Sequence, residues 1–271
     1  MAREVITMPY ADNGGVKIFY DTYGNGTPIV FLHPWTTSGY IWYFQVFPFA
    51  RTNQVIVIDH RGHGRSDKPA SGYAIQTHAS DVAAVLDSLK IDKAILVGNS
   101  IGGMIAMQFA LDYPKRVLGQ FILSSGTGLG EGMPTEAGAA FANNYEATFG
   151  GLLEGAVSAK TKRERPEILE VMKSHFLVQS NFPCQVFDSS FADPNGVFNW
   201  NIKSRLSAIK VPTVVYAGEE DQATPVAANQ LLADNIPGAK LHIVKDVGHF
   251  FQLEKPLEFN AALKEFVSTL R

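Results

Sequence analysis

The stretch from Ala94 to Gly103 combines a short apolar run, a Gly-x-Ser-x-Gly turn centred on Ser100 and an apolar-periodic segment. This order predicts a buried strand, a sharp turn and a helix, with the Ser100 hydroxyl raised above the end of the strand. Small residues at Gly98 and Gly102 allow the neighbouring backbones to approach closely, and the helix directs its N-terminal N–H groups at developing negative charge. The pattern favours acyl transfer by Ser100, although Gly-Ser sequences also form ordinary turns with a surface serine.

A nucleophilic serine needs a base that removes its proton and an acid that fixes the tautomer of that base. His249 follows the last predicted strand and precedes the final helix, so it is the expected base. Asp221 is the expected acid, because it comes latest in an acidic turn, just before a helix. Its neighbours Glu219 and Glu220 are the alternatives, and a solvated turn is the other interpretation of all three carboxylates. The chain order Ser100, Asp221, His249 is one of the orders found in serine hydrolases.

Six other histidines compete with His249 for the role of base. His33 ends a predicted strand beside Pro34, where it suits a structural role bracing the adjacent loop. His60 and His63 lie in a polar, turn-rich loop that resembles a metal site in composition. No second cluster of Asp, Glu, His or Cys has ligand spacing, so we expect no metal. The remaining three fall within helix or strand patterns and are expected at the surface or in packing: His78, His175 and His242.

The oxyanion of a tetrahedral intermediate needs two N–H donors, one after the nucleophile and one in the loop that follows an earlier strand. The expected donors are the backbone N–H groups of Ile101 and Trp35. The Trp35 ring has an alternative interpretation as an aromatic packed under the neighbouring segment, and both roles are compatible. Pro34 fixes its own φ and restrains His33, which makes this loop stiff. Three polar residues near the elbow are candidates to hold a leaving alcohol, or are simply solvated: Asn99, Ser125 and Thr127.

Apolar, β-branched runs alternate with helical periodicity over most of the chain, which predicts an α/β fold with a mostly parallel sheet and helices on both faces. The predicted strands are residues 16–20, 28–33, 54–59, 94–98, 119–124, 211–217 and 240–244. Near-continuous hydrophobicity, as in residues 29–32 and 55–58, indicates strands buried on both faces of the sheet. The predicted helices are residues 79–89, 104–111, 223–235 and 257–270.

The alternation stops between residues 126 and 204, where helical windows occur at 135–149, 152–160 and 166–179. We therefore expect two domains, a core of residues 1–125 and 205–271 and an inserted helical cap of residues 126–204. The aromatic residues of the cap form either its own small core or the apolar wall of a pocket. The candidate substrate-binding residues are Phe141, Tyr145, Trp200 and Phe250. Glu131, at the entrance of the cap, is a more distant alternative for the acid.

Composition limits the partners that the chain is expected to have. With 271 residues, 46% of them hydrophobic, and a net charge of −3, it lacks the basic runs that bind nucleic acid. The single cysteine, Cys184, excludes an internal disulfide and fits a reducing compartment, although one cysteine is equally compatible with export. The N-terminal residues lack an apolar signal core, and no run approaches the ~18 apolar residues of a membrane span. The expected location is the cytoplasm, without membrane contact, and the sequence does not predict an oligomeric state.

With these parts in order, the chain resembles the α/β-hydrolase superfamily from residue 15 to residue 270. The matching blocks are residues 29–35, 55–69, 96–103, 214–225 and 248–256, the second of which reads Asp-x-Arg-Gly-His-Gly-x-Ser-Asp. This resemblance implies an α/β-hydrolase fold with an eight-stranded, mostly parallel sheet and an inserted helical cap. It also implies Ser100, Asp221 and His249 as the catalytic triad.

The branches of the superfamily differ at several of these positions. Ser100 argues against haloalkane dehalogenases and soluble epoxide hydrolases, which carry aspartate there. The Gly-Asn-Ser elbow resembles carbon–carbon bond hydrolases of aromatic degradation, and the Arg-Gly-His-Gly-Arg-Ser-Asp run resembles cofactor-free perhydrolases. However, the His33-Pro34-Trp35 loop departs from both branches. The Ser-Ile-Gly-Gly elbow and the Gly-Glu-Glu-Asp-x-x-Thr-Pro turn resemble enol-lactonases and acyl-homoserine lactonases.

An enol-lactonase substrate is dianionic, whereas an aromatic cap favours an apolar acyl chain. We therefore predict a carboxylesterase with lactonase capacity, acting on small-molecule esters or lactones that include N-acyl homoserine lactones. It requires neither a metal nor an organic cofactor. The alternatives are a carbon–carbon bond hydrolase, an enol-lactonase, a perhydrolase or a non-catalytic small-molecule receptor on the same fold.

Overall fold

Eight strands form one sheet in the order β1-β2-β4-β3-β5-β6-β7-β8 in the computed structural model, which describes residues 9–128, 145–178, 193 and 195–270. The strands are β1 (Tyr10–Asn13), β2 (Val16–Tyr23), β3 (Thr27–Leu32), β4 (Asn53–Ile58), β5 (Ala94–Asn99), β6 (Val117–Leu123), β7 (Thr213–Gly218) and β8 (Lys240–Val244). Strand β2 is antiparallel to both of its neighbours, and all other adjacent strands pair in parallel. The mostly parallel, eight-stranded sheet is confirmed.

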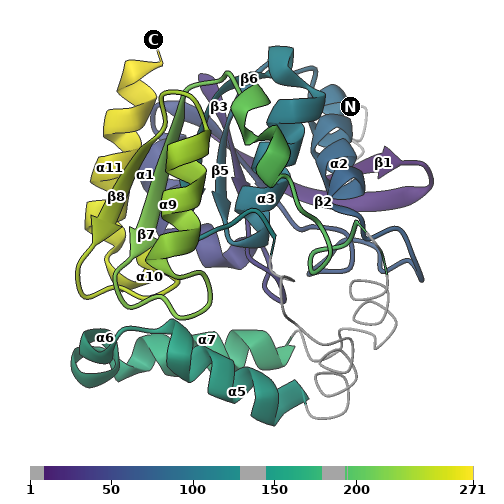
Figure 1. Ribbon diagram of the computed structural model, residues 1–271. Coiled ribbons are helices and arrows are strands. Elements are labelled where there is room, and N and C mark those ends of the chain that lie inside the picture. Colours follow the sequence, from purple (N-terminus) through teal and green to yellow (C-terminus); the bar gives the residue numbers. More distant parts are fainter. Residues whose placement is uncertain (1–8, 129–144, 179–192, 194, 271) are drawn as a thin grey trace.

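Helices cover both faces of this sheet (Figure 1). On one face, α1 (Tyr43–Ala50) packs against α11 (Pro256–Thr269). The other face carries α2 (Ile75–Ser88), α3 (Ile101–Asp112) and α9 (Val226–Asn235). Shorter helical turns are η1 (Gly39–Trp42), η2 (Pro114–Arg116), η4 (Lys203–Ala208) and α10 (Phe251–Glu254). No helix in the described part of the chain is both long and apolar enough to cross a membrane.

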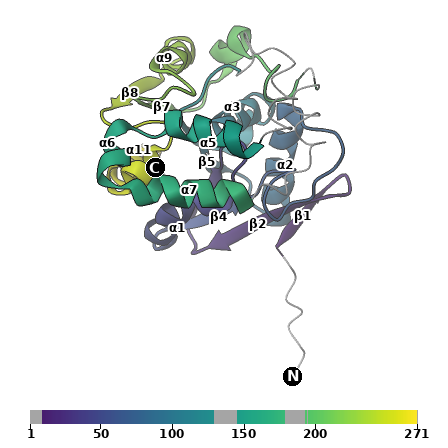
Figure 2. The ribbon, with the colours of Figure 1, turned by 90° about the horizontal axis from the view of Figure 1, so that it is seen from below.

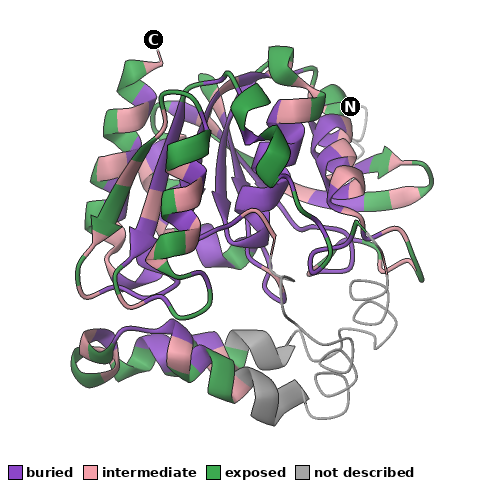
Figure 3. Ribbon diagram, in the orientation of Figure 1, coloured by how far each residue is buried: buried purple, intermediate pink, exposed green. Residues whose placement is uncertain are grey.

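Burial is concentrated in the central strands and in α3 (Figure 3). All six residues of β5 are buried, as expected for a strand covered on both faces. Helix α3 is buried along nearly its whole length, so the element that begins directly after Ser100 is held rigidly by the core. By contrast, the edge strand β8 has no fully buried residue.

Besides the short helical turns, strand β1 and helix α1 were not predicted from the sequence. Strand β1 has only four residues, Tyr-Ala-Asp-Asn, and is too short and polar to show a strand pattern. Helix α1 reads Tyr-Phe-Gln-Val-Phe-Pro-Phe-Ala, which lacks polar spacing and contains Pro48. Tertiary contacts outweigh both local signals. Helix α1 is stabilised by packing against β4 and α11, and strand β1 is stabilised by pairing with β2.

Among the described residues between β6 and β7, and before η4, lie the helices α5 (Tyr145–Ala156), α6 (Ala159–Glu164) and α7 (Pro166–Val178). They lie across the ends of the strands and are seen in front of the sheet from below (Figure 2). The predicted window 152–160 is divided here, since the Ser158 hydroxyl accepts the Thr161 N–H and caps α6. The window 135–149 falls largely outside the described residues, and the division into core and cap stays a prediction.

Candidate active site

Ser100 occupies the turn between β5 and α3 with φ 56° and ψ −118°. This left-handed conformation is rare for a residue with a side chain and is typical of strained functional turns. A Cβ atom at Gly98 would collide with the Gly102 carbonyl, and one at Gly102 would collide with the Leu32 carbonyl of β3. The two glycines of the motif are therefore required by backbone contact. Ser100 itself remains 6% exposed.

Asp221 and His249 come together from the loops that follow β7 and β8. The His249 Nδ1 donates a hydrogen bond of 2.9 Å to the Asp221 Oδ2, which leaves Nε2 as the basic nitrogen. Asp221 also accepts the N–H groups of Ala223 and Thr224 and the Thr224 hydroxyl. Burial alone raises the pKa of Asp221, but the attraction to His249 and these hydrogen bonds outweigh it, so its pKa lies below the ordinary value. The carboxylate therefore stays ionised and can stabilise an imidazolium.

The two neighbouring glutamates face elsewhere. Glu219 is exposed, and Glu220 accepts the backbone N–H of Ala159 at the start of α6 through its Oε2 atom, at 2.8 Å. Among the three carboxylates of this turn, Asp221 is the one whose hydrogen bond reaches the imidazole. The structure thus gives Asp221 the contact that the sequence could only infer from position.

The backbone around His249 is fixed by a buried carboxylate that the sequence analysis did not single out. Glu254, 4% exposed, accepts the Gly248 N–H through Oε1 at 2.9 Å and the Ser158 N–H through Oε2 at 3.0 Å. In addition, the His249 N–H donates to the Ala156 carbonyl at the end of α5, at 2.6 Å. One carboxylate therefore joins the histidine loop to the α5–α6 turn. In the sequence it is an acidic residue among mixed apolar and polar residues before Pro256, which gives no signal of its role.

Two of the polar residues proposed to hold a leaving alcohol are already occupied. The Asn99 amide donates to the His249 carbonyl at 3.3 Å, and its oxygen accepts from Gln252 at 2.9 Å. The Ser125 hydroxyl donates to the backbone carbonyl of Ser100 at 2.8 Å. Both side chains are buried and serve the scaffold, so the prediction is wrong for Asn99 and Ser125. For the half-buried Thr127, the role of holding the leaving alcohol stays a prediction.

The expected oxyanion donors lie in two different elements. Ile101 is the first residue of α3, where a backbone N–H has no intrahelical acceptor. Trp35 lies in the loop after β3, and its ring packs edge-to-face on Phe198 at 5.0 Å, as the packing interpretation expected. The loop is locked by hydrogen bonds from the Thr37 hydroxyl to the Pro34 carbonyl and from the Thr36 hydroxyl to the Trp35 carbonyl. The roles of Ile101 and Trp35 as donors stay predictions.

Four buried histidines form a cluster behind this loop, here called the histidine cluster: His33, His60, His63 and His78. Burial is the main cause that lowers the pKa of His60 to about 3 and that of His63 to about 4. The His33 Nε2 accepts the His60 N–H, so its Nδ1 donates to the Pro34 carbonyl. Both nitrogens of His33 are thus used in bracing the loop, as the sequence predicted. His78 is in the core, in keeping with the packing role expected for it. In the described part of the chain no group of three or more His, Cys, Asp or Glu residues, this cluster included, is arranged so that it could hold a metal ion.

The predicted substrate-binding residues have mixed outcomes. Trp200 is buried and donates its Nε1–H to the Gln108 Oε1, so it packs inside the protein. Phe250 packs edge-to-face on the His249 ring at 5.1 Å. Phe141 and the Tyr145 side chain lie outside the described residues, as does Glu131, the more distant alternative for the acid.

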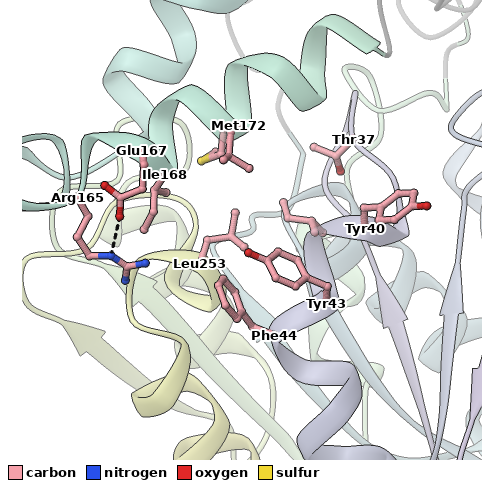
Figure 4. A pocket seen from close by; sticks show the side chains of 11 residues that line it. Thr37, Tyr40, Tyr43, Phe44, Arg165, Glu167, Ile168, Met172 and Leu253 are labelled. Carbon is pink, nitrogen blue, oxygen red and sulfur yellow. Dashed lines mark hydrogen bonds and ion pairs between the residues drawn. The ribbon is translucent and has the colours of Figure 1, made fainter.

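An apolar pocket of about 430 Å³ lies between α7 and the η1–α1 segment (Figure 4). Its lining comes from side chains that the sequence analysis did not single out, among them Phe44, Ile168, Met172 and Leu253. Trp200 and Phe250, the described members of the predicted set, do not line it.

Residues 29–262 match the alpha/beta hydrolase family. The chain belongs to this family. The solved structure of Est816, named as an N-acyl homoserine lactone degrading enzyme, is 72% identical and has a TM-score of 0.91, covering 95% of this chain and 100% of that one. A 2-hydroxy-6-oxononadienedioate/2-hydroxy-6-oxononatrienedioate hydrolase of Burkholderia vietnamiensis is 32% identical, over 94% of this α/β hydrolase and 92% of the relative. A 3-oxoadipate enol-lactonase of Acinetobacter baylyi is 28% identical, over 92% of both chains.

Proposed function

We propose that this α/β hydrolase is a serine esterase and lactonase that opens N-acyl homoserine lactones through an acyl-enzyme. The observation that carries the chemistry is the 2.9 Å hydrogen bond from His249 to Asp221, which leaves Nε2 as the basic nitrogen. Ser100, in its strained turn between β5 and α3, supplies the hydroxyl. These are the parts that nucleophilic acyl transfer requires.

In this mechanism the Ser100 Oγ attacks the lactone carbonyl carbon while the His249 Nε2 takes the hydroxyl proton. The backbone N–H groups of Ile101 and Trp35 stabilise the oxyanion, and Asp221 stabilises the imidazolium. Collapse of the intermediate breaks the bond to the ring oxygen, which receives the proton from His249. Water, activated by the same imidazole, then attacks the acyl-enzyme and releases the open N-acyl homoserine.

The choice of substrate rests on similarity over the whole chain. Est816 shares 72% of its residues with this protein and is covered completely. The Gly-Asn-Ser elbow also resembles carbon–carbon bond hydrolases, but the Asn99 side chain is used to hold His249 and Gln252. The asparagine therefore has a structural explanation and does not favour that alternative. The cytoplasmic location and the absence of nucleic-acid partners stay predictions.

The experiment compares lactone opening and aryl-ester hydrolysis in the wild-type protein, Ser100→Ala, His249→Ala and Asp221→Asn, each with and without a chelator. We expect a loss on the order of 10⁶-fold in kcat for Ser100→Ala and about 10⁴-fold for Asp221→Asn, because the latter disturbs the histidine tautomer. The matched controls Glu219→Gln and Glu220→Gln should retain most of the activity.

Near-normal turnover by folded Ser100→Ala protein would remove the serine mechanism. A large loss in Glu219→Gln or Glu220→Gln, with Asp221→Asn unaffected, would reassign the acid. Hydrolysis of esters together with inert lactones would leave an esterase only. A wild-type protein that binds lactones without turnover would be a receptor, and chelator-sensitive turnover would contradict the mechanism.

A further inference from the structure

Thr224 donates a hydrogen bond to each oxygen of the Asp221 carboxylate. Oδ1 accepts the N–H groups of Ala223 and Thr224 at 2.9 and 3.0 Å. Oδ2 accepts the His249 Nδ1–H at 2.9 Å and the Thr224 hydroxyl at 2.8 Å. The terminal torsion of an aspartate is broad, so its rotamer does not decide which oxygen faces the imidazole. Bonds from one residue to both oxygens hold the carboxylate in a single orientation.

The Thr224 hydroxyl contacts both members of the acid–base pair. Besides its bond to Asp221 Oδ2, it lies 3.3 Å from the His249 Nδ1. The two backbone N–H groups act on Oδ1, so the hydroxyl is the donor that restrains the oxygen facing the imidazole. Without this hydroxyl, the carboxylate would be free to turn toward the backbone donors and lengthen its bond to His249.

Thr224 is held in turn by Asn229, a buried residue on α9. The Asn229 Nδ2 group donates to the Thr224 carbonyl at 3.0 Å and to the Pro225 carbonyl at 3.3 Å. Its Oδ1 accepts the Ser125 N–H at 3.0 Å. Both ends of the amide are therefore used, and they join the turn after β7 to the segment after β6.

Ser125 completes the connection to the turn that carries the nucleophile. Its hydroxyl donates to the Ser100 carbonyl at 2.8 Å. The preceding residue, Ser124, has φ 45°, a left-handed conformation that is uncommon for a residue with a side chain. Such strain persists where the surroundings enforce it and clusters at functional sites. Buried hydrogen bonds thus connect the Ser100 turn to the Asp221 turn through Asn229.

We propose that Thr224 is a positioning residue, which fixes the Asp221 carboxylate with Oδ2 toward His249. Asn229 supports it by tying the acid turn to the nucleophile turn. This inference rests on the proposed function, since it concerns the acid of the same triad. A misplaced Oδ2 slows proton transfer by the imidazole and leaves substrate binding unchanged, so the effect falls on kcat.

The first measurement is steady-state turnover of an aryl ester per active site titrated by a serine-directed fluorophosphonate. Thr224→Val has nearly the same shape and keeps the N–H bond to Oδ1, but it lacks the hydroxyl. Its kcat should fall about tenfold, with KM changed by less than about twofold. Thr224→Ser restores the hydroxyl and should keep kcat within about threefold of the wild-type value.

Thr213→Val is the matched control. Thr213 is also buried on β7, and its hydroxyl donates to the Val211 carbonyl and accepts from Gln120, both at 2.9 Å. It begins the strand, whereas the acid turn follows the end of the strand. This variant should lower Tm but keep the wild-type kcat per titrated site.

The role of Asn229 is tested by combining two variants. Asn229→Ala should lower kcat about tenfold, and together with Thr224→Val the two losses should not multiply, because both act through the same carboxylate. Losses that multiply would show that Asn229 acts by another route and would remove it from the proposal.

The second measurement needs no substrate. The charge-assisted hydrogen bond from His249 Nδ1 to Asp221 gives a low-field proton resonance, which is identified by its loss in His249→Ala. Thr224→Val should shift this resonance, and Thr213→Val should leave it in place.

A wild-type kcat per titrated site in Thr224→Val would overturn the proposal. So would equal losses in Thr224→Val and Thr224→Ser, or an unmoved resonance in Thr224→Val. Failure of the proposed function looks different, because wild-type protein would then show no Ser100-dependent turnover of lactones or esters. In that case the resonance still reports whether Thr224 positions Asp221.

Discussion

Replacing Glu254 by glutamine tests whether the histidine loop and the α5–α6 turn are coupled through one carboxylate. The two oxygens of Glu254 accept the N–H groups of Gly248 and Ser158 at 2.9 and 3.0 Å. Glutamine has nearly the same shape, but only one oxygen, so its NH₂ group must face one of the two N–H donors. One hydrogen bond to a charged acceptor is lost, and a buried N–H is left without a partner.

The magnitude follows from burial, because Glu254 is 4% exposed and solvent cannot replace the lost bond. A hydrogen bond to a charged group contributes about 1.5–3 kcal/mol, so we expect Glu254→Gln to lower the free energy of unfolding by about 2 kcal/mol. This corresponds to a decrease in Tm of about 5 °C for a chain of this size. Activity should fall as well, by about tenfold in kcat with little change in KM, because Gly248 directly precedes His249.

The assay combines thermal unfolding with steady-state turnover of an aryl ester, normalised to the active sites titrated by a serine-directed fluorophosphonate. Normalisation separates positioning of His249 from simple loss of folded protein. Glu258→Gln is the matched control, since Glu258 lies 63% exposed and 3.8 Å from Lys255, where an ion pair contributes little. Wild-type Tm and wild-type kcat per titrated site in Glu254→Gln would refute the coupling.

Two further predictions concern the core around the site. Below pH 6.5 the histidines of the unfolded chain become protonated, whereas buried His60 in the folded protein stays neutral because its pKa is about 3. Stability should therefore decrease as pH falls from 6.5 toward 4, by about 3 kcal/mol from His60 alone at pH 4.5, in urea unfolding of wild-type protein and of the exposed control His242→Gln. Equal stability at pH 7 and pH 4.5 would contradict neutral buried histidines. Gly102→Ala should lower Tm, because the added methyl group meets the Leu32 carbonyl, whereas Gly150→Ala on α5 adds a methyl group in open space and should stabilise by about 0.5–1 kcal/mol. An unchanged Tm in Gly102→Ala would show that the turn around Ser100 can accommodate a methyl group at this position.

The sequence by itself was sufficient for features that depend on neighbouring residues. The seven longer strands were found because each contains a run rich in apolar, β-branched residues, and the position of Ser100 followed from the glycines on either side of it. The order Ser100, Asp221, His249 could be proposed because each residue lies in the turn or loop after a predicted strand, and parallel strands end at the same edge of a sheet. Glu219 and Glu220 remained rivals of Asp221 until the hydrogen bond to His249 was seen.

Only the tertiary structure decided the contacts between segments that are far apart in the chain. Glu254 reaches Ser158 across 96 residues, and Asn99 reaches the His249 carbonyl across 150. The pocket is likewise lined by α1 and α7, and the sequence pattern of neither helix predicts that the other lies next to it. Local propensity and periodicity report which face of an element is buried, but not which distant element covers it. That choice is made by close packing and by the need to pair buried polar groups, and both exist only in the folded chain.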